Sequence, residues 1–539
     1  MISGAEIMVK CLENEGVSVV FGYPGAAICP FFDALYTSNI EAVLVRQEQN
    51  AAHAASGYAR ALTTIGVCVA TSGPGATNLI TGIATAYMDS IPMIAITGQV
   101  RSDLIGRDVF QEADITGACE PFVKHSYLVK DTNELARVFK EAFHIATTGR
   151  PGPVLIDVPI DIQQNKVESF SYPEKADIIG YKPSVQGHPL QIQRAMELIR
   201  KAQRPLICAG GGVLSSGAKL GLVAFAEKAN IPLISTMMGI GVIPSDHRLY
   251  GGMLGSHGKK AANKAIHEAD LLILCGARVG DRSVAAPNQI TEKAAVIHID
   301  IDPAEIGKNM KTTVPIVGDM KKIITTMNEK VDFHAPDAWV ERINQWKTEF
   351  STEPPVFEGY VEPRSFIGKL SSMLRPKAVL VADVGQNQIW CANNYKINDG
   401  RFLTSGGMGT MGYSVPAALG AKKARPDRDV VAVCGDGSFQ MSLNELATIV
   451  QNNLGVKIIV MRNKRLGMVR ELQDNLYGSR HVITILDDVP DFCKIAEAYG
   501  IESAFASTNA EAEQAVLHML ETDKPFLLVC DVHPDTPSN

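Results

Sequence analysis

The stretch from residue 431 to 469, VAVCGDGSFQMSLNELATIVQNNLGVKIIVMRNKRLGMV, limits the possible folds more than any other part of the chain. Residues 431–434 and 456–461 are short apolar runs typical of buried parallel strands, and residues 442–452 between them have helical spacing. Strand, helix and strand in this order form a β-α-β unit. The sequence therefore predicts an α/β fold built on doubly wound parallel sheets.

Polar residues directly follow both predicted strands. Asp436 stands between Gly435 and Gly437 after the first strand, and Asn463 comes after the second. Ligands of parallel sheets bind beyond the carboxyl ends of the strands, so these two side chains should meet there. Glycines let the backbone approach a large anion, and carboxylate and amide oxygens suit Mg²⁺. A Mg²⁺-diphosphate site is the functional interpretation, although G-D-G is common and, taken alone, more often marks an ordinary β-α-β connection.

The longer pattern is more specific, because 25 residues separate Gly437 from Asn463. This spacing resembles the diphosphate-binding signature of thiamine-diphosphate (ThDP) enzymes. The resemblance implies that Asp436, Asn463 and the backbone carbonyl of Arg465 hold the metal. The signature usually ends in two asparagines and this chain has Arg462-Asn463, but the metal-binding residue of the pair is the second. The resemblance also places the following residues at the cofactor: Gly435, Gly437, Ser438, Gly467 and Met468.

Length, composition and charge indicate a globular protein of several domains and favour small-molecule chemistry. The 539 residues are 46% hydrophobic and 20% charged, which is ordinary for about three globular domains. The net charge of −7 argues against nucleic-acid binding, which relies on a basic field. Polar, proline-bearing passages predict three domains at 1–165, 188–340 and 360–539.

The cysteines and the apolar runs bear on the compartment. The ten cysteines are scattered without a C-x-x-C pair, and several lie inside apolar runs, as expected for buried thiols in a reducing cytoplasm. The N-terminus begins with an amphipathic pattern rather than a signal peptide, and the chain has no run of 18 apolar residues. We expect a cytoplasmic protein without a membrane segment.

Glu48 lies at the predicted start of an alanine- and glycine-rich helix in VLVRQEQNAAHAASGYARA. A lone glutamate at this position usually serves only as a favourable charge near a helix N-terminus. The segment resembles the one in which ThDP enzymes bury a carboxyl group beside N1′ of the aminopyrimidine. The resemblance implies that Glu48 protonates N1′ and so favours the 4′-imino tautomer, while the cofactor performs the carbon chemistry.

Several further segments narrow the family: GYPGAA, TSGPGATN, GRDVFQEAD and GRPGPVLIDVP. Together they resemble the large, catalytic subunit of biosynthetic acetolactate (acetohydroxyacid) synthases along the whole chain. The resemblance implies that Gly25, Phe110 and Gln111 line the reaction cleft, although Phe110 and Gln111 could equally be packing and surface residues.

The middle of the chain resembles the FAD-binding segments of the same family. The motif around Gly210 and Gly211 fails the full G-x-G-x-x-G pattern at Ser215 and is weak evidence for a dinucleotide alone. By resemblance, an FAD without net redox work contacts Arg150, Gly210, Gly211, His257, Gly276, Arg278, Asp300 and Asp319. Arg282 matches the arginine that holds the carboxylate of the second 2-oxoacid, a task that suits a guanidinium fork. The alternative is a surface ion pair.

The last domain supplies the remaining cofactor contacts. By resemblance, Gly385, Gln386 and Asn387 form the loop beside the diphosphate, and Asn387 replaces the usual histidine. Gly409 is expected to accept from the 4′-amino group through its carbonyl, and Met411 to support the bent cofactor, or else simply to fill the core. In this family Glu48 and Asp436 act on one cofactor from different subunits. We therefore expect a homodimer or a tetramer, together with a regulatory small subunit.

The resemblance implies decarboxylation of pyruvate and addition of the two-carbon unit to a second pyruvate or to 2-oxobutanoate, in branched-chain amino-acid synthesis. The alternatives are a catabolic, FAD-independent acetolactate synthase, another ThDP carboligase such as glyoxylate carboligase, and a cofactor-binding protein without turnover. Besides Arg462 and Asn387, two further positions depart from the family. Leu472 stands where many members have a tryptophan that contacts the ethyl group of 2-oxobutanoate, and Ile160 replaces a lysine. We therefore expect only a weak preference for 2-oxobutanoate.

Overall fold

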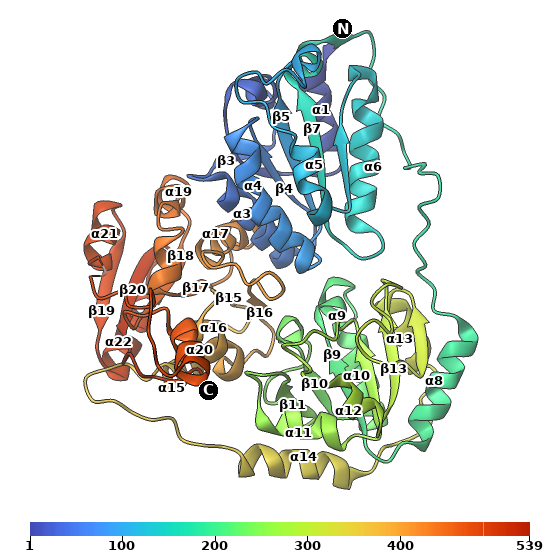
Figure 1. Ribbon diagram of the computed structural model, residues 1–539, viewed down its shortest axis with the longest axis vertical. Coiled ribbons are helices and arrows are strands. Elements are labelled where there is room, and N and C mark those ends of the chain that lie inside the picture. Colours follow the sequence, from blue (N-terminus) through green and yellow to red (C-terminus); the bar gives the residue numbers. More distant parts are fainter. Residues whose placement is uncertain (489) are drawn as a thin grey trace.

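The computed structural model describes residues 1–488 and 490–539 and contains three six-stranded parallel sheets, one in each third of the chain (Figure 1). The central strands are apolar runs that are buried on both faces, the edge strands β3, β6 and β19 are partly exposed, and helices cover the sheets, as in other doubly wound folds. The predicted fold class is confirmed.

The N-terminal sheet has the strand order β3-β2-β4-β5-β7-β6. The order reverses between β2 and β4, so the loops after these strands face a crevice at the carboxyl edge of the sheet. Its elements are α1 (Gly4–Asn14), β2 (Val19–Tyr23), α2 (Cys29–Leu35), β3 (Glu41–Leu44), α3 (Glu48–Leu62), β4 (Gly66–Ala70), α4 (Pro74–Met88), β5 (Met93–Gln99), α5 (Ile115–Cys119), β6 (His125–Leu128), α6 (Leu135–Thr147), β7 (Pro153–Pro159) and α7 (Ile160–Gln164). A short antiparallel pair, β1 (Ile2–Ser3) with β8 (Lys166–Val167), closes this part.

The middle sheet has the order β11-β10-β9-β12-β13-β14, which is the 3-2-1-4-5-6 order of dinucleotide-binding folds. Its switch point lies between β9 and β12. Its elements are α8 (Pro189–Lys201), β9 (Pro205–Ala209), α9 (Gly211–Ser215), α10 (Lys219–Ala229), β10 (Leu233–Ser235), β11 (Tyr250–Met253), α11 (Lys260–Glu268), β12 (Leu271–Cys275), α12 (Pro287–Thr291), β13 (Ala295–Asp300), β14 (Val314–Val317), α13 (Met320–Asn328) and α14 (Asp337–Glu349).

The C-terminal sheet, β16-β15-β17-β18-β20-β19, repeats the order of the N-terminal sheet, with its switch point between β15 and β17. Its elements are α15 (Pro363–Met373), β15 (Val379–Ala382), α16 (Gln386–Asn394), β16 (Arg401–Leu403), α17 (Ser414–Ala424), β17 (Val430–Gly435), α18 (Asp436–Gln440), α19 (Glu445–Gln451), β18 (Val456–Arg462), α20 (Gly467–Tyr477), α21 (Phe492–Ala498), β19 (Glu502–Ala506), α22 (Asn509–Leu520) and β20 (Phe526–Asp531).

The predicted β-α-β unit is present as β17 and β18, which pair in parallel with Gly435 opposite Met461. The helical part differs from the expectation of one helix over 442–452. A short helix, α18, begins directly at Asp436, and a second one, α19, begins at Glu445. Phe439 of α18 packs edge-on against Phe492, and this buried contact holds a first turn that hydrophobic spacing alone did not reveal.

Helices α3 and α17 join the N-terminal and C-terminal sheets, and they lie against each other in Figure 1. Gly57 of α3 faces the carbonyl of Ala417, and Gly420 of α17 faces the carbonyl of Ala54, so closely that a β-carbon at either glycine would overlap the facing backbone. The core between the two sheets is consequently continuous.

The middle part is connected by two longer passages, 168–188 before α8 and 350–362 before α15, visible in Figure 1 as extended strips. It has its own two hydrophobic clusters. Within residues 1–488 and 490–539, none of the helices is both long and apolar enough to span a bilayer.

Candidate active site

Asp436 and Asn463 each occupy the first position after a strand, β17 and β18, at the carboxyl edge of the C-terminal sheet. The carboxylate of Asp436 accepts from the backbone N–H of Lys464 at 2.6 Å and of Gly437 at 2.9 Å. The side chain is almost fully buried, and this burial raises the pKa of Asp436 to about 6. A bound cation would favour the ionised form of such a carboxylate.

The neighbouring side chains hold Asn463 in place. Its amide N–H donates to Oε1 of Gln386 at 2.8 Å, and its Oδ1 accepts from the N–H of Arg465 at 3.0 Å. A β-carbon at Gly467 would collide with the same Gln386 oxygen, so only glycine fits there. Gln386 is fixed in turn by Glu471 at 2.8 Å and by the carbonyl of Thr536 at 2.9 Å.

Asn387 lies on the other side of the switch point, after β15, in the first turn of α16 and not in the expected loop. Its Nδ2 donates to the carbonyls of Asp383 at 2.8 Å and Val433 at 3.2 Å, while its Oδ1 is turned toward Gly385 and Gly435. Gly385 has a φ of +137°, which only glycine adopts readily. Ser438, one turn into α18, accepts from the N–H of Gly435 at 3.1 Å. The expected diphosphate residues therefore form one cluster, but the donors of Asn387 are directed at backbone carbonyls.

Glu48 begins α3, after the edge strand β3, and its carboxyl group lies near Gly75, which follows β4 at the switch point of the N-terminal sheet. Its Oε2 accepts from Nδ2 of Asn78 at 3.0 Å. Thr71, after β4, packs close to both Gly25 and Gly75, and its buried hydroxyl has no hydrogen-bond partner among the described residues. A buried hydroxyl beside a carboxylate and two glycines suits the edge of a planar, nitrogen-bearing ring.

Two expected cleft residues lie close to this N-terminal cluster. Gln111 has a φ of +58° and its backbone lies against Gly73. Phe110 next to it is 87% exposed, which is unusual for a phenylalanine and is typical of a side chain that another surface covers.

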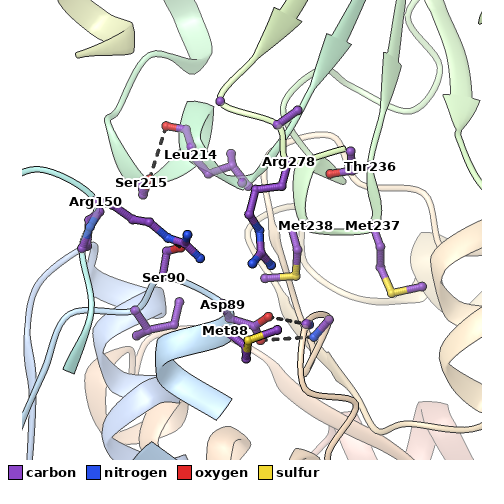
Figure 2. A pocket seen from close by; sticks show the side chains of 18 of the residues that line it. Met88, Asp89, Ser90, Arg150, Leu214, Ser215, Thr236, Met237, Met238 and Arg278 are labelled. Atoms are coloured by element: carbon purple, nitrogen blue, oxygen red, sulfur yellow. Dashed lines mark hydrogen bonds between the residues drawn. The ribbon is translucent and has the colours of Figure 1, made fainter. Parts of the chain in front are cut away.

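A cavity of about 1350 Å³ opens where the three parts of the chain meet (Figure 2). It lies over the switch point of the middle sheet, where the N–H of Gly212 after β9 donates to the carbonyl of Gly276 after β12 at 3.0 Å. Seven of the eight residues expected at FAD line it: Arg150, Gly211, His257, Gly276, Arg278, Asp300 and Asp319. The eighth, Gly210, packs beneath them against Ala277.

The positive charges of arginines and the negative charges of carboxylates are paired along this cavity. Arg150 donates to the Ser90 hydroxyl at 2.8 Å and to Glu305 at 3.1 Å. Burial raises the pKa of Asp300 to about 6, against the effect of its bond from the N–H of Asp302. The volume and the mixture of glycine edges, arginines and acids suit a dinucleotide, whose phosphates and ribose hydroxyls need such partners.

Four more predicted residues line the same cavity: Arg282 and Leu472 of the expected acceptor site, and Gly409 and Met468, which are expected at ThDP. The Arg282 side chain is 79% exposed and its nearest acid, Asp281, lies 3.7 Å away. Its guanidinium is therefore free to meet an anion in the cavity. Met411 lies deeper, and its Cε is near Gly437 of the diphosphate cluster.

The structure does not bring all the predicted residues together in one chain. Among the described residues, the cavity lining includes neither the N-terminal cluster of Gly25, Glu48, Phe110 and Gln111 nor the metal residues Asp436 and Asn463. The predicted residues thus fall into three groups, one at each switch point.

Sequence reasoning missed three polar side chains that support these groups: Thr71, Asp383 and Asp89. Thr71 lies inside the TSGPGATN motif, but a turn motif gives no sign of an unpartnered hydroxyl. Asp383 follows the apolar strand β15 and accepts from the N–H groups of Gly412 and Ser414. Its position directly after a strand, like that of Asp436, could have identified Asp383 from the sequence as a candidate site residue.

Comparison with known proteins matches all three parts. Family models match as "Thiamine pyrophosphate enzyme, N-terminal TPP binding domain" over residues 2–118, "central domain" over 192–327 and "C-terminal TPP binding domain" over 383–530. The acetolactate synthase large subunits of Buchnera aphidicola subsp. Schizaphis graminum and Haemophilus influenzae are 44% and 42% identical over 99% of this chain and 95% of their own lengths. An acetolactate synthase of Mycobacterium bovis is 45% identical over 93% of this chain and 83% of its own length.

With three ThDP-enzyme domains in order and this identity along almost the entire chain, the protein belongs to the acetolactate synthase large-subunit family of thiamine-diphosphate enzymes.

Proposed function

We propose that this chain is the catalytic subunit of an acetolactate synthase. It decarboxylates pyruvate and joins the two-carbon unit to a second pyruvate or to 2-oxobutanoate, for branched-chain amino-acid synthesis. The observation that carries the proposal is the pair Asp436 and Asn463 at one switch point, with the Glu48 cluster at the corresponding point of the other sheet of the same order.

Asp436, the amide oxygen of Asn463 and the carbonyl of Arg465 are the proposed Mg²⁺ ligands, completed by diphosphate oxygens. Glycine edges at Gly435 and Gly437 let the diphosphate approach. ThDP, once bound, supplies the electron sink that decarboxylation of a 2-oxoacid requires.

Glu48 is the proposed proton donor to N1′ of the aminopyrimidine, and the amide of Asn78 orients its carboxyl group. Thr71 offers a further hydrogen bond to the same ring. Arg282 holds the carboxylate of the second 2-oxoacid, and Leu472 lines the space for its side chain. Arg150, Arg278 and the glycine turns of the middle sheet hold FAD.

Glu48 and Asp436 belong to separate clusters, and Phe110 is exposed beside the first of them, which supports a site shared between two chains. We therefore propose a homodimer as the smallest active unit. Two dimers can form a tetramer, and a regulatory small subunit is the proposed partner. The printed names of the relatives say "large subunit", which supports a smaller partner. The ten cysteines are free thiols in the described structure, which suits the proposed cytoplasmic location.

The test is acetolactate formation from pyruvate by the purified chain with ThDP, Mg²⁺ and FAD, each omitted in turn. We expect activity that requires ThDP and Mg²⁺, and a flavin absorbance spectrum that stays with the protein after gel filtration. Pyruvate decarboxylation without acetolactate would reject the carboligase, and full activity of a flavin-free protein would reject the FAD assignment alone.

A further inference from the structure

The loop between β16 and α17, residues 404–413, carries Gly409 and Met411. Its own domain fixes the ends of the loop. Ser405 Oγ accepts from the N–H of Thr410 at 3.0 Å, and the buried carboxylate of Asp383 accepts from the N–H of Gly412 at 2.9 Å. Gly409 itself, with a φ of +70°, has open space around it. The middle of the loop therefore depends on contacts from elsewhere.

These contacts come from the N-terminal domain of the same chain. Asp89, at the end of α4, accepts from the N–H of Gly407 through Oδ1 at 2.7 Å and from the N–H of Gly406 through Oδ2 at 3.1 Å. Figure 2 draws both bonds as dashed lines. One turn earlier, the hydroxyl of Thr85 lies 2.7 Å from that of Thr410. The last turn of α4 thus forms hydrogen bonds with the loop on both sides of Gly409.

Gly406 and Gly407 of the loop pack closely against their neighbours, which include Asp89. A β-carbon at Gly407 would lie 3.0 Å from Asp89 Oδ1 and 3.0 Å from the carbonyl of Met88, and one at Gly406 would strike the sulfur of Met238. Two glycines in succession allow the carboxylate to reach both N–H groups.

Positive groups and N–H donors surround the half-buried carboxylate of Asp89 and help to hold it in place. Burial raises its pKa, and Arg60, the two N–H groups and Arg278 lower it. The Arg278 guanidinium points toward Asp89 from the middle domain in Figure 2. Arg60 also donates to the carbonyl of Thr404 at 2.7 Å, at the start of the loop. Groups from all three domains therefore meet at the Asp89 carboxylate: Arg60 from the N-terminal domain, Arg278 from the middle domain and the loop from the C-terminal domain.

We propose that Asp89 is a positioning residue for ThDP, which acts through the Gly406–Gly407 backbone to set the place of Gly409 and Met411. This inference rests on the proposed function of those two residues. Without the carboxylate, the loop keeps its ends and the Thr85–Thr410 contact but loses the two hydrogen bonds at Gly406 and Gly407, so the cofactor is held less tightly and is less well placed for turnover. Asp89 also lines the cavity assigned to FAD, but its action on ThDP in this account runs only through the loop backbone.

The experiment compares Asp89→Asn and Asp89→Ala with Asp332→Asn. Asp332 is an exposed carboxylate of the middle domain that pairs with Arg200 and serves as the matched control. For each holoenzyme we would measure kcat, the KM for pyruvate, the ThDP dissociation constant by calorimetry with Mg²⁺, and the melting temperature.

We expect Asp89→Ala to raise the ThDP dissociation constant and to lower kcat, each by about tenfold or more, because two charge-assisted hydrogen bonds are lost. Asp89→Asn, which keeps one acceptor, should lie between Asp89→Ala and wild type. The KM for pyruvate should match that of Asp332→Asn, while the melting temperature should fall below that of the control, because the same two bonds join two domains. Gly407→Ala, which disturbs the same contact from the loop side, should give the same pattern if Asp89→Ala fails to fold.

Wild-type kcat and ThDP affinity in Asp89→Ala would overturn the proposal. So would a fall in melting temperature alone, with wild-type kcat in the folded fraction, because a merely structural role predicts that result. If wild type makes no acetolactate while the Asp89 variants still bind ThDP more weakly, the proposed function fails and the positioning role stands.

Discussion

The N-terminal and C-terminal sheets have the same strand order, yet their switch points carry opposite chemistry. The N-terminal one presents a carboxyl group, a lone hydroxyl and closely packed glycines around a space that suits a neutral ring. The C-terminal one presents a buried carboxylate and amides that suit a metal and a diphosphate. The topology provides the place for a ligand, and a few loop residues decide which ligand it is.

Glu48→Gln should give the largest effect and tests the N-terminal side alone. An amide cannot donate a proton as the carboxyl does, so acetolactate formation should fall by roughly 10² to 10⁴, the range for general acid–base catalysis. Calorimetry should find ThDP affinity close to wild type. Glu134→Gln, at an exposed ion pair with Arg137, is the control. Near-wild-type turnover would remove Glu48 from the catalytic role.

Asp436→Ala tests the C-terminal side and should have the complementary outcome. The metal loses its only charged protein ligand, so ThDP affinity in Mg²⁺ should fall by roughly 100-fold. Added ThDP should restore part of the turnover, which it cannot do for Glu48→Gln. If both variants lose affinity equally, the division of labour between the two sheets is wrong.

Arg282→Ala extends the comparison to the middle sheet. The second 2-oxoacid loses a charge-assisted partner for its carboxylate, so carboligation should fall by about tenfold or more, while release of CO₂ from the first pyruvate changes less. The ratio of acetolactate formed to CO₂ released, measured on the same sample, reports the difference. An unchanged ratio would mean that Arg282 serves both steps or neither.

His53 lies in α3 at the junction of the two sheets, fully buried and edge-on to Tyr413 at 5.3 Å. Burial lowers the pKa of His53 from 6.5 to about 3. Between these values the unfolded chain binds the proton and the folded one does not. The contribution of His53 to stability is therefore complete above pH 6.5 and is lost as the pH falls toward 3.

We expect the wild-type free energy of unfolding to drop by about 2 kcal/mol more than that of His53→Asn between pH 6.5 and pH 5. Denaturant unfolding at both pH values measures it. Parallel pH dependences in the two proteins would show that His53 is solvated or paired, and that the junction is looser than described.

Leu472→Trp should give the smallest effect. Leu472 lines the cavity and is 44% exposed, so a larger ring has room there. A whole methylene is worth about 1–3 kcal/mol, and leucine already offers an apolar contact, so the ratio of acetohydroxybutyrate to acetolactate should rise by less than roughly tenfold. A competition assay with both 2-oxoacids gives the ratio. A strong wild-type preference for 2-oxobutanoate that the variant leaves unchanged would place Leu472 outside the acceptor site.

Sequence patterns predicted the strands and helix starts that depend on residues close together in the chain. The strands on either side of Asp436 and the start of α3 at Glu48 follow from apolar runs and turn residues. The separate helix α18 was missed because Phe439 is held by Phe492, far along the chain. The orientation of Asn387 and the hydrogen bond from the N–H of Gly407 to Asp89 also depend on tertiary contacts, which hydrophobic spacing does not encode.

The close contact of α3 with α17 has a consequence for how the protein is made. Ala54 and Gly57 bury their face against residues of α17, which the ribosome synthesises more than 300 positions later. At about 5–20 residues per second, the nascent α3 waits roughly 20–70 s for its partner, while the middle domain emerges and can fold between them. During that time a small-residue surface intended for close packing is open to other chains. Efficient production should therefore depend on chaperones that shield the N-terminal third, and slower elongation through residues 189–349 should increase aggregation.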